Sequence, residues 1–414
     1  METLSRVKTS SPDTSIADVL IVGAGPAGLA LAIALAQAGI ASTVLEQAPL
    51  ASLADPPEDG RDIALTHRSR RFLESLGLWQ RLPGEEIAPL RQAHVIDGTS
   101  PWVLPFSAAS EGHQALGWLV PNHHIRAACH ALAAGMPRIR LQGEARAVAF
   151  GRDADCAWVD TSSPQGPGTT RHRARLVVAA DSRFSSLRRL AGIGARMLDF
   201  GRTAIVCRMA HERDHEGIAH ECFRYGNTLA MLPMAGRQSS AVLTVRSDET
   251  PGWLSASEQA FAARLADQFA HRLGDMQLSG QRHAYPLVAT YAHRFAERRF
   301  ALVGDAAVGM HPVTAHGYNF GLYGIDRLAA TLRASHQAGR DLGDINLLEP
   351  WAAEHRRVTL PIYVGTNAIV RLFTDDRAPA RVARSAVLRV ASGIGPLKSA
   401  IARQLTGRSP LQRT

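Results

Sequence analysis

Three glycines and one glutamate near the amino terminus have the types and the spacing of a site for a phosphate-bearing ligand. Gly23, Gly25 and Gly28 follow a short apolar run in G-x-G-x-x-G order. Glu46 ends the next apolar run. The glycines allow a tight turn, a close backbone approach to a pyrophosphate and close packing of helix on strand. Free N–H groups at the helix start attract phosphates, and the glutamate can accept hydrogen bonds from both ribose hydroxyls. The set predicts a dinucleotide site.

A second carboxylate stands at the end of a later predicted strand. Phe300–Val303 is apolar and leads to Asp305, and residues 317–336 have helical spacing. A carboxylate in this place suits a polyol chain such as the ribitol of a flavin. The helix that begins near Tyr318 and Asn319 would direct its positive end at the flavin ring. A reduced flavin gains negative charge, which a helix N-terminus stabilises.

Two arginines and three histidines lie in segments that flank the predicted site. Arg61 precedes an amphipathic helix, and Arg126 lies within the next one. Arg61 could reach a phosphate or a ribose, but its pattern fits an ordinary surface arginine equally well. His123, His124 and His130 have no carboxylate or cysteine at a helical interval, so we expect no metal site.

The elements that must position these residues begin with a βαβ unit. The pattern predicts strands at 18–22 and 42–45 and a small-residue helix at 29–38. The alternative is a membrane span, because residues 19–40 carry no charge and are long enough for a bilayer. Three glycines and Pro26 crowd the first half of that segment, so the βαβ unit is favoured.

Later segments predict a second kind of sheet. Arg175–Ala180 reads as a buried strand that ends in Asp181, as in the first unit. Residues 202–247 contain short strands separated by turns, which is typical of an antiparallel sheet and so of a second domain. A helix follows, with Ser255 and Glu258 as its predicted capping box.

Composition limits the classes of partner and compartment. The 414 residues include 46% hydrophobic and 20% charged residues, as in a globular protein of about two domains. The net charge is +9, yet no nucleic-acid-binding motif accompanies it, and we expect no nucleic acid partner. The four cysteines form no C-x-x-C pair, which favours reduced thiols and a cytoplasmic protein, with peripheral contact to an inner membrane left open.

Taken together, these motifs resemble the class A flavoprotein monooxygenases, and among them the ubiquinone-biosynthesis hydroxylases of the UbiH/UbiF/VisC type. The resemblance spans nearly the whole chain, and the UbiM-like subgroup is the most similar. It rests on three motifs, which are GAGPAG at 23–28 with Glu46, DSRFSSLR at 181–188, and Gly304-Asp305 followed by His311-Pro312 and by Gly317, Asn319 and Gly321.

The resemblance implies an α/β protein with a hydroxybenzoate-hydroxylase-type fold. In this fold a Rossmann-like FAD-binding domain carries an inserted antiparallel-sheet substrate domain and C-terminal helices. We expect residues 1–75, 107–185 and 283–376 in the FAD-binding domain and residues 76–106 and 186–282 in the substrate-binding domain. Residues 377–414 would form a basic helical tail.

The resemblance also implies the cofactor and the reaction. Bound FAD, reduced by NAD(P)H, would use O2 to hydroxylate a prenylated phenol or quinol of ubiquinone biosynthesis, for instance in a 5-demethoxyubiquinol-type step. The residues expected at FAD are Gly23, Gly25, Ala27, Gly28, Glu46, Arg61, Arg126, Asp181, Asp305, Pro312, Gly317, Tyr318 and Asn319.

The chain departs from the family pattern at several positions. Ser182 replaces the usual glycine after Asp181, at a place that the family uses near the flavin and the nicotinamide. Thr314, Ala315 and His316 replace an A-G-Q sequence, and Gly324 stands where an aspartate is customary. Two alternatives therefore stay open, a monooxygenase of small soluble phenols and a non-catalytic flavin-binding assembly protein.

His311 and Pro312 are the candidate catalytic residues, on the loop expected beside the flavin. His311 and His316 could act as bases on a phenol or deliver protons. The favoured interpretation is that His311 packs before Pro312, because this chemistry needs positioning and exclusion of water more than a strong base.

The carboxyl-terminal segment holds most of the net charge. Residues 377–414 contain eight Lys and Arg and no Asp or Glu, against +9 for the whole chain. Two short amphipathic helices fit this segment, and a basic helix with an apolar stripe suits an anionic membrane surface. Docking onto a partner in a quinone-synthesis complex, and packing on the FAD-binding domain, are the alternatives. The oligomeric state is not predicted.

Overall fold

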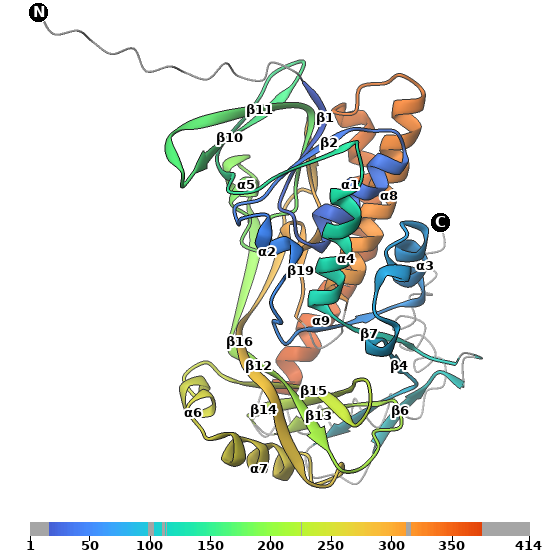
Figure 1. The fold of residues 1–414 in the computed structure, drawn as a ribbon, viewed down its shortest axis with the longest axis vertical. Coiled ribbons are helices and arrows are strands. Elements are labelled where there is room, and N and C mark those ends of the chain that lie inside the picture. The colour runs from blue at the N-terminus through green and yellow to red at the C-terminus, as the bar shows by residue number, and fades with distance from the viewer. Residues whose placement is uncertain are drawn as a thin grey trace, which may run out of the picture.

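The structure is a computed structural model that describes residues 16–97, 103–109, 112, 114–224, 226–311 and 316–374. These residues form a mixed eight-stranded sheet at one end, a second eight-stranded sheet at the other, and a three-stranded sheet (Figure 1). Two long strands, β12 and β16, run between the two ends of the molecule (Figure 1). The predicted tail and Pro312 lie outside the described residues.

The first sheet has a parallel centre in the order β18-β11-β1-β2-β8. Its strands are β1 (Ala17–Val22), β2 (Ser42–Leu45), β8 (Ile139–Gln142), β9 (Arg146–Arg152), β10 (Ala157–Ser163), β11 (Gly166–Ala179), β17 (Ala296–Glu297) and β18 (Phe300–Leu302). Because parallel strands present their carboxyl ends at one edge, the residues after β1, β2, β11 and β18 meet there. Segments far apart in the sequence thus supply one site.

Helices pack on this sheet and on one another. α1 (Pro26–Gln37) packs against α4 (Asn122–Ala134) and α8 (Gly317–Gln337), and α8 packs against α9 (Ile345–Thr374) (Figure 1). α1 begins at Pro26 rather than at residue 29 as predicted, because proline suits the first turn of a helix. Small and aliphatic residues fill α1, and nearly all of them are buried. The shorter helices are α2 (Ala51–Ala54), α3 (His67–Ser75) and α5 (Ser186–Leu190).

The second sheet has the order β19-β16-β12-β15-β14-β13-β5-β6. Its strands are β5 (Gln92–Asp97), β6 (Val103–Ser107), β12 (Ala195–His211), β13 (Ile218–Arg224), β14 (Asn227–Pro233), β15 (Gln238–Arg246), β16 (Met276–Ala292) and β19 (Val308–Gly309). The neighbours are antiparallel, as predicted for 202–247, except that β13 and β5 are parallel.

The two faces of the second sheet differ in what covers them. α6 (Thr250–Leu254) and α7 (Glu258–Gln268) lie beside the outer face, where Phe261 and Leu265 join Ile205 and Met209 in an apolar core. The inner face contributes to three smaller apolar clusters that contact the rest of the molecule. Ala204 belongs to one of them. The third sheet, β3 (Asp62–Leu65), β7 (Gly117–Pro121) and β4 (Ala88–Leu90), packs on that inner face. Assignment of the segments to cofactor and substrate domains stays a prediction.

The cap of α7 lies two residues beyond the serine predicted for it. Ser257, not Ser255, caps the helix, and its hydroxyl accepts a hydrogen bond from the Ala260 amide at 3.2 Å. Ser255 instead ends α6, and Glu258 is the first residue of α7. Because α6 and α7 follow one another closely, Ser255 is the C-cap of the first helix and Ser257 is the N-cap of the second.

Within the described residues, no helix has both the length and the hydropathy needed to cross a bilayer. The four cysteines are free thiols, and all of them are buried.

Candidate active site

The glycine-rich turn after β1 has the shape that the sequence predicted. A Cβ at Gly23, where φ is +107°, would lie 2.4 Å from the Ala180 carbonyl oxygen. A Cβ at Gly28 would lie 2.0 Å from the Gly23 carbonyl oxygen. Both glycines are therefore required by the close packing of β1, β11 and α1. A Cβ at Gly25 would meet nothing within 4 Å, so open space adjoins the backbone where a pyrophosphate would approach.

Glu46 lies at this turn. Its Oε2 accepts a hydrogen bond from the Ala24 amide at 2.8 Å, and its Oε1 accepts one from the Ala48 amide at 3.0 Å. The carboxylate is thus fixed between the glycine turn and the end of β2. It stands where a ribose beyond the pyrophosphate would present its hydroxyls.

The Gly304-Asp305 turn lies at the start of α8. Gly304 has φ of +59°, and a Cβ at Gly321 would lie 3.3 Å from the Gly304 Cα, so α8 approaches this turn closely. Asp305 is about one-third exposed at 34%, and its Oδ2 is 3.0 Å from Nη2 of Arg183. Arg183 also donates to the Val288 carbonyl at 3.1 Å. Arg183 was not among the site residues predicted from the sequence, although it lies within the DSRFSSLR motif.

Arg61 and Arg126 meet at one carboxylate that the sequence motifs also did not predict. Asp59 Oδ2 is 2.6 Å from Arg61 Nη2 and 3.9 Å from Arg126 Nη1, and it accepts a hydrogen bond from Asn122 at 2.7 Å. The Tyr285 hydroxyl donates to the Asp59 carbonyl at 2.6 Å. Asp59 therefore holds both predicted arginines on one side of the site, and the Arg61 side chain remains half exposed.

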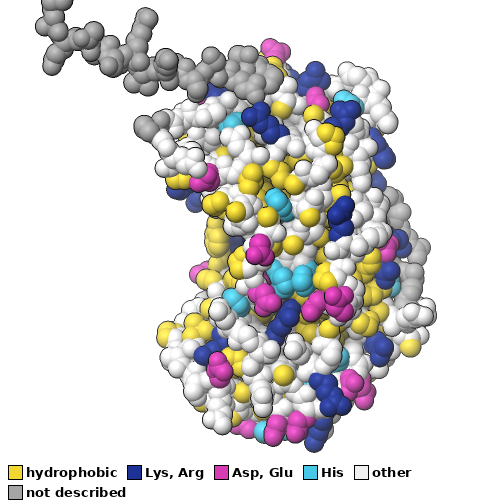
Figure 2. Space-filling view, in the orientation of Figure 1, with side chains coloured by type: hydrophobic (Ala, Val, Ile, Leu, Met, Phe, Trp, Pro, Cys, Tyr) yellow, Lys and Arg dark blue, Asp and Glu magenta, His cyan; other side chains and the backbone are white. Residues whose placement is uncertain are grey.

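A polar hollow adjoins Arg61 between the second large sheet, the start of β3 and α4. Its lining is Glu58, Gly60, Arg61, Asp62, His123, Arg208, Ser279, Gln281 and His283. Figure 2 shows histidine and acidic side chains gathered at the middle of one face of the molecule. Burial raises the pKa of Asp62 to about 6, although Arg208 lies 3.6 Å away. Among the described residues, no group of three or more His, Cys, Asp or Glu side chains has the arrangement of a metal site.

Two predicted cofactor residues have other contacts in the structure. Asp181 caps α5, since its carboxylate accepts hydrogen bonds from Ser185 Oγ and from the Leu187 amide at 3.0 Å. The Asn319 amide joins α8 to the β3–α3 connection, with Thr66 N donating to its oxygen at 3.0 Å and its nitrogen donating to the Ala64 carbonyl at 2.8 Å. These contacts position the strand ends around the site.

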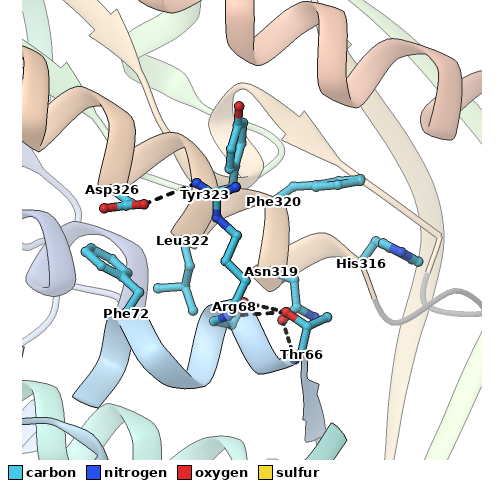
Figure 3. Close-up of a pocket in the computed structure, with 10 residues that line it drawn as sticks. Thr66, Arg68, Phe72, His316, Asn319, Phe320, Leu322, Tyr323 and Asp326 are labelled. Atoms are coloured by element: carbon cyan, nitrogen blue, oxygen red, sulfur yellow. Dashed lines mark hydrogen bonds and ion pairs between the residues drawn. The ribbon is translucent and has the colours of Figure 1, made fainter. Parts of the chain in front are cut away.

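Figure 3 shows the junction of α3 and α8, where Asn319 and Thr66 lie against each other in a small pocket. Arg68 crosses this pocket, 3.4 Å from Asp326 and stacked 4.3 Å from the centre of the Tyr323 ring. Tyr318 is on a different side of α8, close to the Cys129 thiol of α4, and burial raises the pKa of its hydroxyl. The side chain of Tyr318 thus contributes to helix packing.

His311 is buried near Arg183, and the centroid of its ring lies 5.0 Å from that of the Phe200 ring. Burial, with Arg183 and Arg202 nearby, lowers its pKa to about 4. The imidazole is therefore neutral at neutral pH and a weak proton acceptor. These properties agree with the interpretation that His311 packs rather than acts as a strong base, and its role stays a prediction.

The residues fit a flavin dinucleotide. A fixed carboxylate at Glu46, an open approach at Gly25 and a second carboxylate at Asp305 follow one another along the carboxyl edge of the parallel sheet, after β2, β1 and β18. This order matches the adenosine ribose, the pyrophosphate and the ribitol of FAD. The FAD binding domain family model matches residues 16–357, which confirms the class as an FAD-binding flavoprotein.

Relatives define the family more narrowly. The chain is 42% identical to ubiquinone hydroxylase UbiM of Neisseria meningitidis over 398 residues, covering 94% of this chain and 84% of the relative. It is 40% identical to ubiquinone hydroxylase UbiL of Rhodospirillum rubrum, covering 96% and 91%. The chain therefore belongs to the FAD-dependent monooxygenases of the ubiquinone-biosynthesis hydroxylase family, as predicted.

Solved structures confirm the fold. The p-nitrophenol 4-monooxygenase PnpA of Pseudomonas putida superposes with a TM-score of 0.76 at 19% identity, covering 95% of this chain and 99% of that chain. At this identity the likeness concerns the fold alone.

Proposed function

We propose that the protein hydroxylates the aromatic ring of a prenylated phenol or quinol intermediate of ubiquinone biosynthesis, with NAD(P)H as electron donor. The observation that carries this proposal is the 42% identity to a ubiquinone hydroxylase over 94% of the chain, with the cofactor-binding edge intact. FAD, when bound, supplies the activation of O2 for insertion of one oxygen atom into the ring. A monooxygenase of small soluble phenols is the alternative substrate class, which the named relatives favour less.

The protein's own residues hold and shield the reacting groups. Glu46, Asp305 and the α1 N-terminus would bind FAD, and Arg183 would fix the orientation of Asp305. The inner face of the second sheet supplies apolar side chains, among them Ala204, Val206 and Leu287. Such a lining excludes water, which protects reactive species from hydrolysis.

The experiment has two stages and uses the purified FAD-loaded protein. First, NADH or NADPH is mixed with it anaerobically in the presence of a short-chain demethoxyquinol, and flavin absorbance is followed. Then air is admitted and the product is analysed by mass spectrometry. We expect the flavin to bleach and the product to gain one oxygen atom. A flavin that never bleaches contradicts the proposed donor, and equal turnover of simple phenols contradicts the prenylated substrate class.

We also propose a peripheral contact with an anionic membrane. The basic segment 377–414 suggests it, and α9 adds support because it leads to that segment and leaves Leu360 and Val364, which share one face of the helix, exposed at 41% and 53%. No acidic residue occurs between positions 355 and 374. An exposed apolar stripe without acidic neighbours is compatible with an anionic surface.

A further inference from the structure

One carboxyl group on the inner face of the second sheet has no role in the site described above. Glu221 lies in β13, paired with Ala230 of β14 and with Val95 of β5. Side chains alternate between the faces of a strand. Cys222, the next residue, belongs to the outer core with Phe261, and Phe223 belongs to the inner cluster with Leu104 and Phe106. Glu221 therefore shares the inner face with Phe223.

The surroundings of Glu221 are apolar. The inner cluster beside it contains Leu104, Phe106, Leu116 and Phe223, with Val95 and Leu372 packed against them. Among the described residues, no group forms a hydrogen bond or an ion pair with the Glu221 carboxyl. Buried polar groups in folded proteins almost always have a partner, so an isolated carboxyl in an apolar region needs an explanation.

The Glu221 side chain nevertheless retains some accessible surface. Burial raises its pKa to about 8, with no charged neighbour contributing. The side chain therefore borders space that the protein atoms leave open. At neutral pH its carboxyl is protonated, and a protonated carboxyl can donate one hydrogen bond.

The other charged groups of this sheet and its covering helices lie too far from the Glu221 carboxyl, or on the opposite face of the sheet. Arg202 and Arg208 are on β12, three strands from β13 in the sheet order. His220, His94 and Arg272 cluster on the outer face, beside Phe269. Among the described side chains, therefore, none of these supplies a partner for Glu221 within the protein.

We propose that Glu221 is a substrate-positioning residue whose protonated carboxyl donates a hydrogen bond to a ring oxygen of the quinone-type substrate. The proposal rests on the proposed function, because it names the polar contact within that substrate's pocket. A quinone ring with methoxy and carbonyl oxygens offers acceptors, and its prenyl chain matches the apolar cluster beside Glu221. A bound oxygen would satisfy the carboxyl that the protein itself leaves unpaired.

The test measures binding rather than turnover. A short-chain methoxyquinone is used because it accepts hydrogen bonds and has no titrating proton. Its dissociation constant is measured with the FAD-loaded protein by flavin fluorescence at several pH values. For wild type we expect affinity to fall roughly tenfold between about pH 7 and pH 9, as a carboxyl with a pKa near 8 ionises. Glu221→Gln keeps a donor at every pH and is expected to bind with a constant affinity.

Two further variants complete the comparison. Glu221→Leu loses the donor and is expected to bind roughly threefold to tenfold more weakly at neutral pH, the usual effect of one neutral hydrogen bond. Glu258→Gln, on the exposed start of α7, is the matched control and is expected to follow the wild-type pH profile. A wild-type affinity that does not change with pH, or one that changes equally in Glu221→Gln, overturns the proposal. Absence of quinone binding at every pH contradicts the proposed substrate class instead.

Discussion

Ser182 is a residue at which this chain differs from the family pattern. It stands where a glycine is usual, and its φ is +95°, in the region that favours glycine. The serine follows Asp181, whose carboxylate caps α5 through the Leu187 amide. The turn is therefore fixed by capping on its carboxyl-terminal side, and the serine adopts a strained conformation. The serine thus has the backbone conformation that a glycine would favour, so the departure by itself gives no support to a non-catalytic protein.

The strain at this position predicts the effect of restoring the glycine. A left-handed conformation costs a residue with a Cβ roughly 1–2 kcal/mol, and the added freedom of glycine in the unfolded chain cancels part of the gain. We expect Ser182→Gly to raise the free energy of unfolding by about 0.5–1 kcal/mol, measured by urea denaturation of the FAD-loaded protein. Ser182→Ala keeps the Cβ and is expected to gain nothing. An equal gain in both variants would show that the hydroxyl, not the backbone, is the unfavourable feature.

The packing of α8 on α9 explains a second departure from the family pattern. A Cβ at Gly324 would lie 2.3 Å from Cε1 of His355, which is buried at 1% exposure. The Trp351 indole donates to the Gly324 carbonyl at 2.9 Å in the same contact. The His355 ring occupies the space that a side chain at 324 would need. The exchange of the customary aspartate for glycine is thus a change in how two helices pack.

This contact predicts strong coupling between the two positions. Overpacking a core typically costs about 1–3 kcal/mol, so Gly324→Ala should destabilise the protein by about 2 kcal/mol. In a His355→Ala background the same change should be neutral or stabilising, by up to about 1 kcal/mol of helix propensity. The control is Gly365→Ala in α9, where a Cβ would meet nothing within 4 Å, and it should stabilise slightly. Additive effects in the double-mutant cycle would show that the ring does not occupy this space.

The whole molecule has a strongly uneven charge distribution. Residues 377–414 carry eight of the positive charges without an acidic residue, against a net +9 for the entire chain, so the remainder is close to neutral. α9 leads to this segment and exposes Leu360 and Val364. A prenylated substrate partitions into a bilayer, and an enzyme that collects it there benefits from contact with the anionic surface. The contact would be peripheral and weakened by salt, because the charges are screened within about 10 Å at ~0.1 M salt.

We expect the full-length, FAD-loaded protein to bind anionic vesicles but not neutral ones at low salt. Each Lys or Arg near such a surface contributes about 1 kcal/mol, so ending the chain at Asp376 should abolish binding while flavin is retained. Leu360→Glu with Val364→Glu should weaken binding roughly tenfold, whereas Val148→Glu, an exposed valine in β9, should not. Equal sedimentation of the truncated protein with vesicles would rule out the tail as the contact. Insolubility of that variant would favour packing of the tail on the FAD-binding part.

The sequence by itself determined the cofactor class and the elements that hold it. The glycine spacing at 23–28, Glu46 and Asp305 each depend on local geometry, a turn, a strand end and a helix start, which neighbouring residues specify. The family followed from the same residues together with the 181–188 motif, and the relatives confirmed it. The antiparallel strands of 202–247 also followed from local alternation, because a strand with one solvated face alternates in character.

Tertiary structure decided the contacts that join segments far apart in the chain. No local pattern relates Arg183 to Asp305, Asp59 to Arg126, or Gly324 to His355, since each pair meets only when sheets and helices pack. The position of Glu221 also depends on the sheet order, because a glutamate in an alternating strand reads as a solvent-facing residue until the face it shares is covered. Burial is a property of the assembled fold, and the chemistry of a buried side chain follows from its surroundings rather than from its place in the sequence.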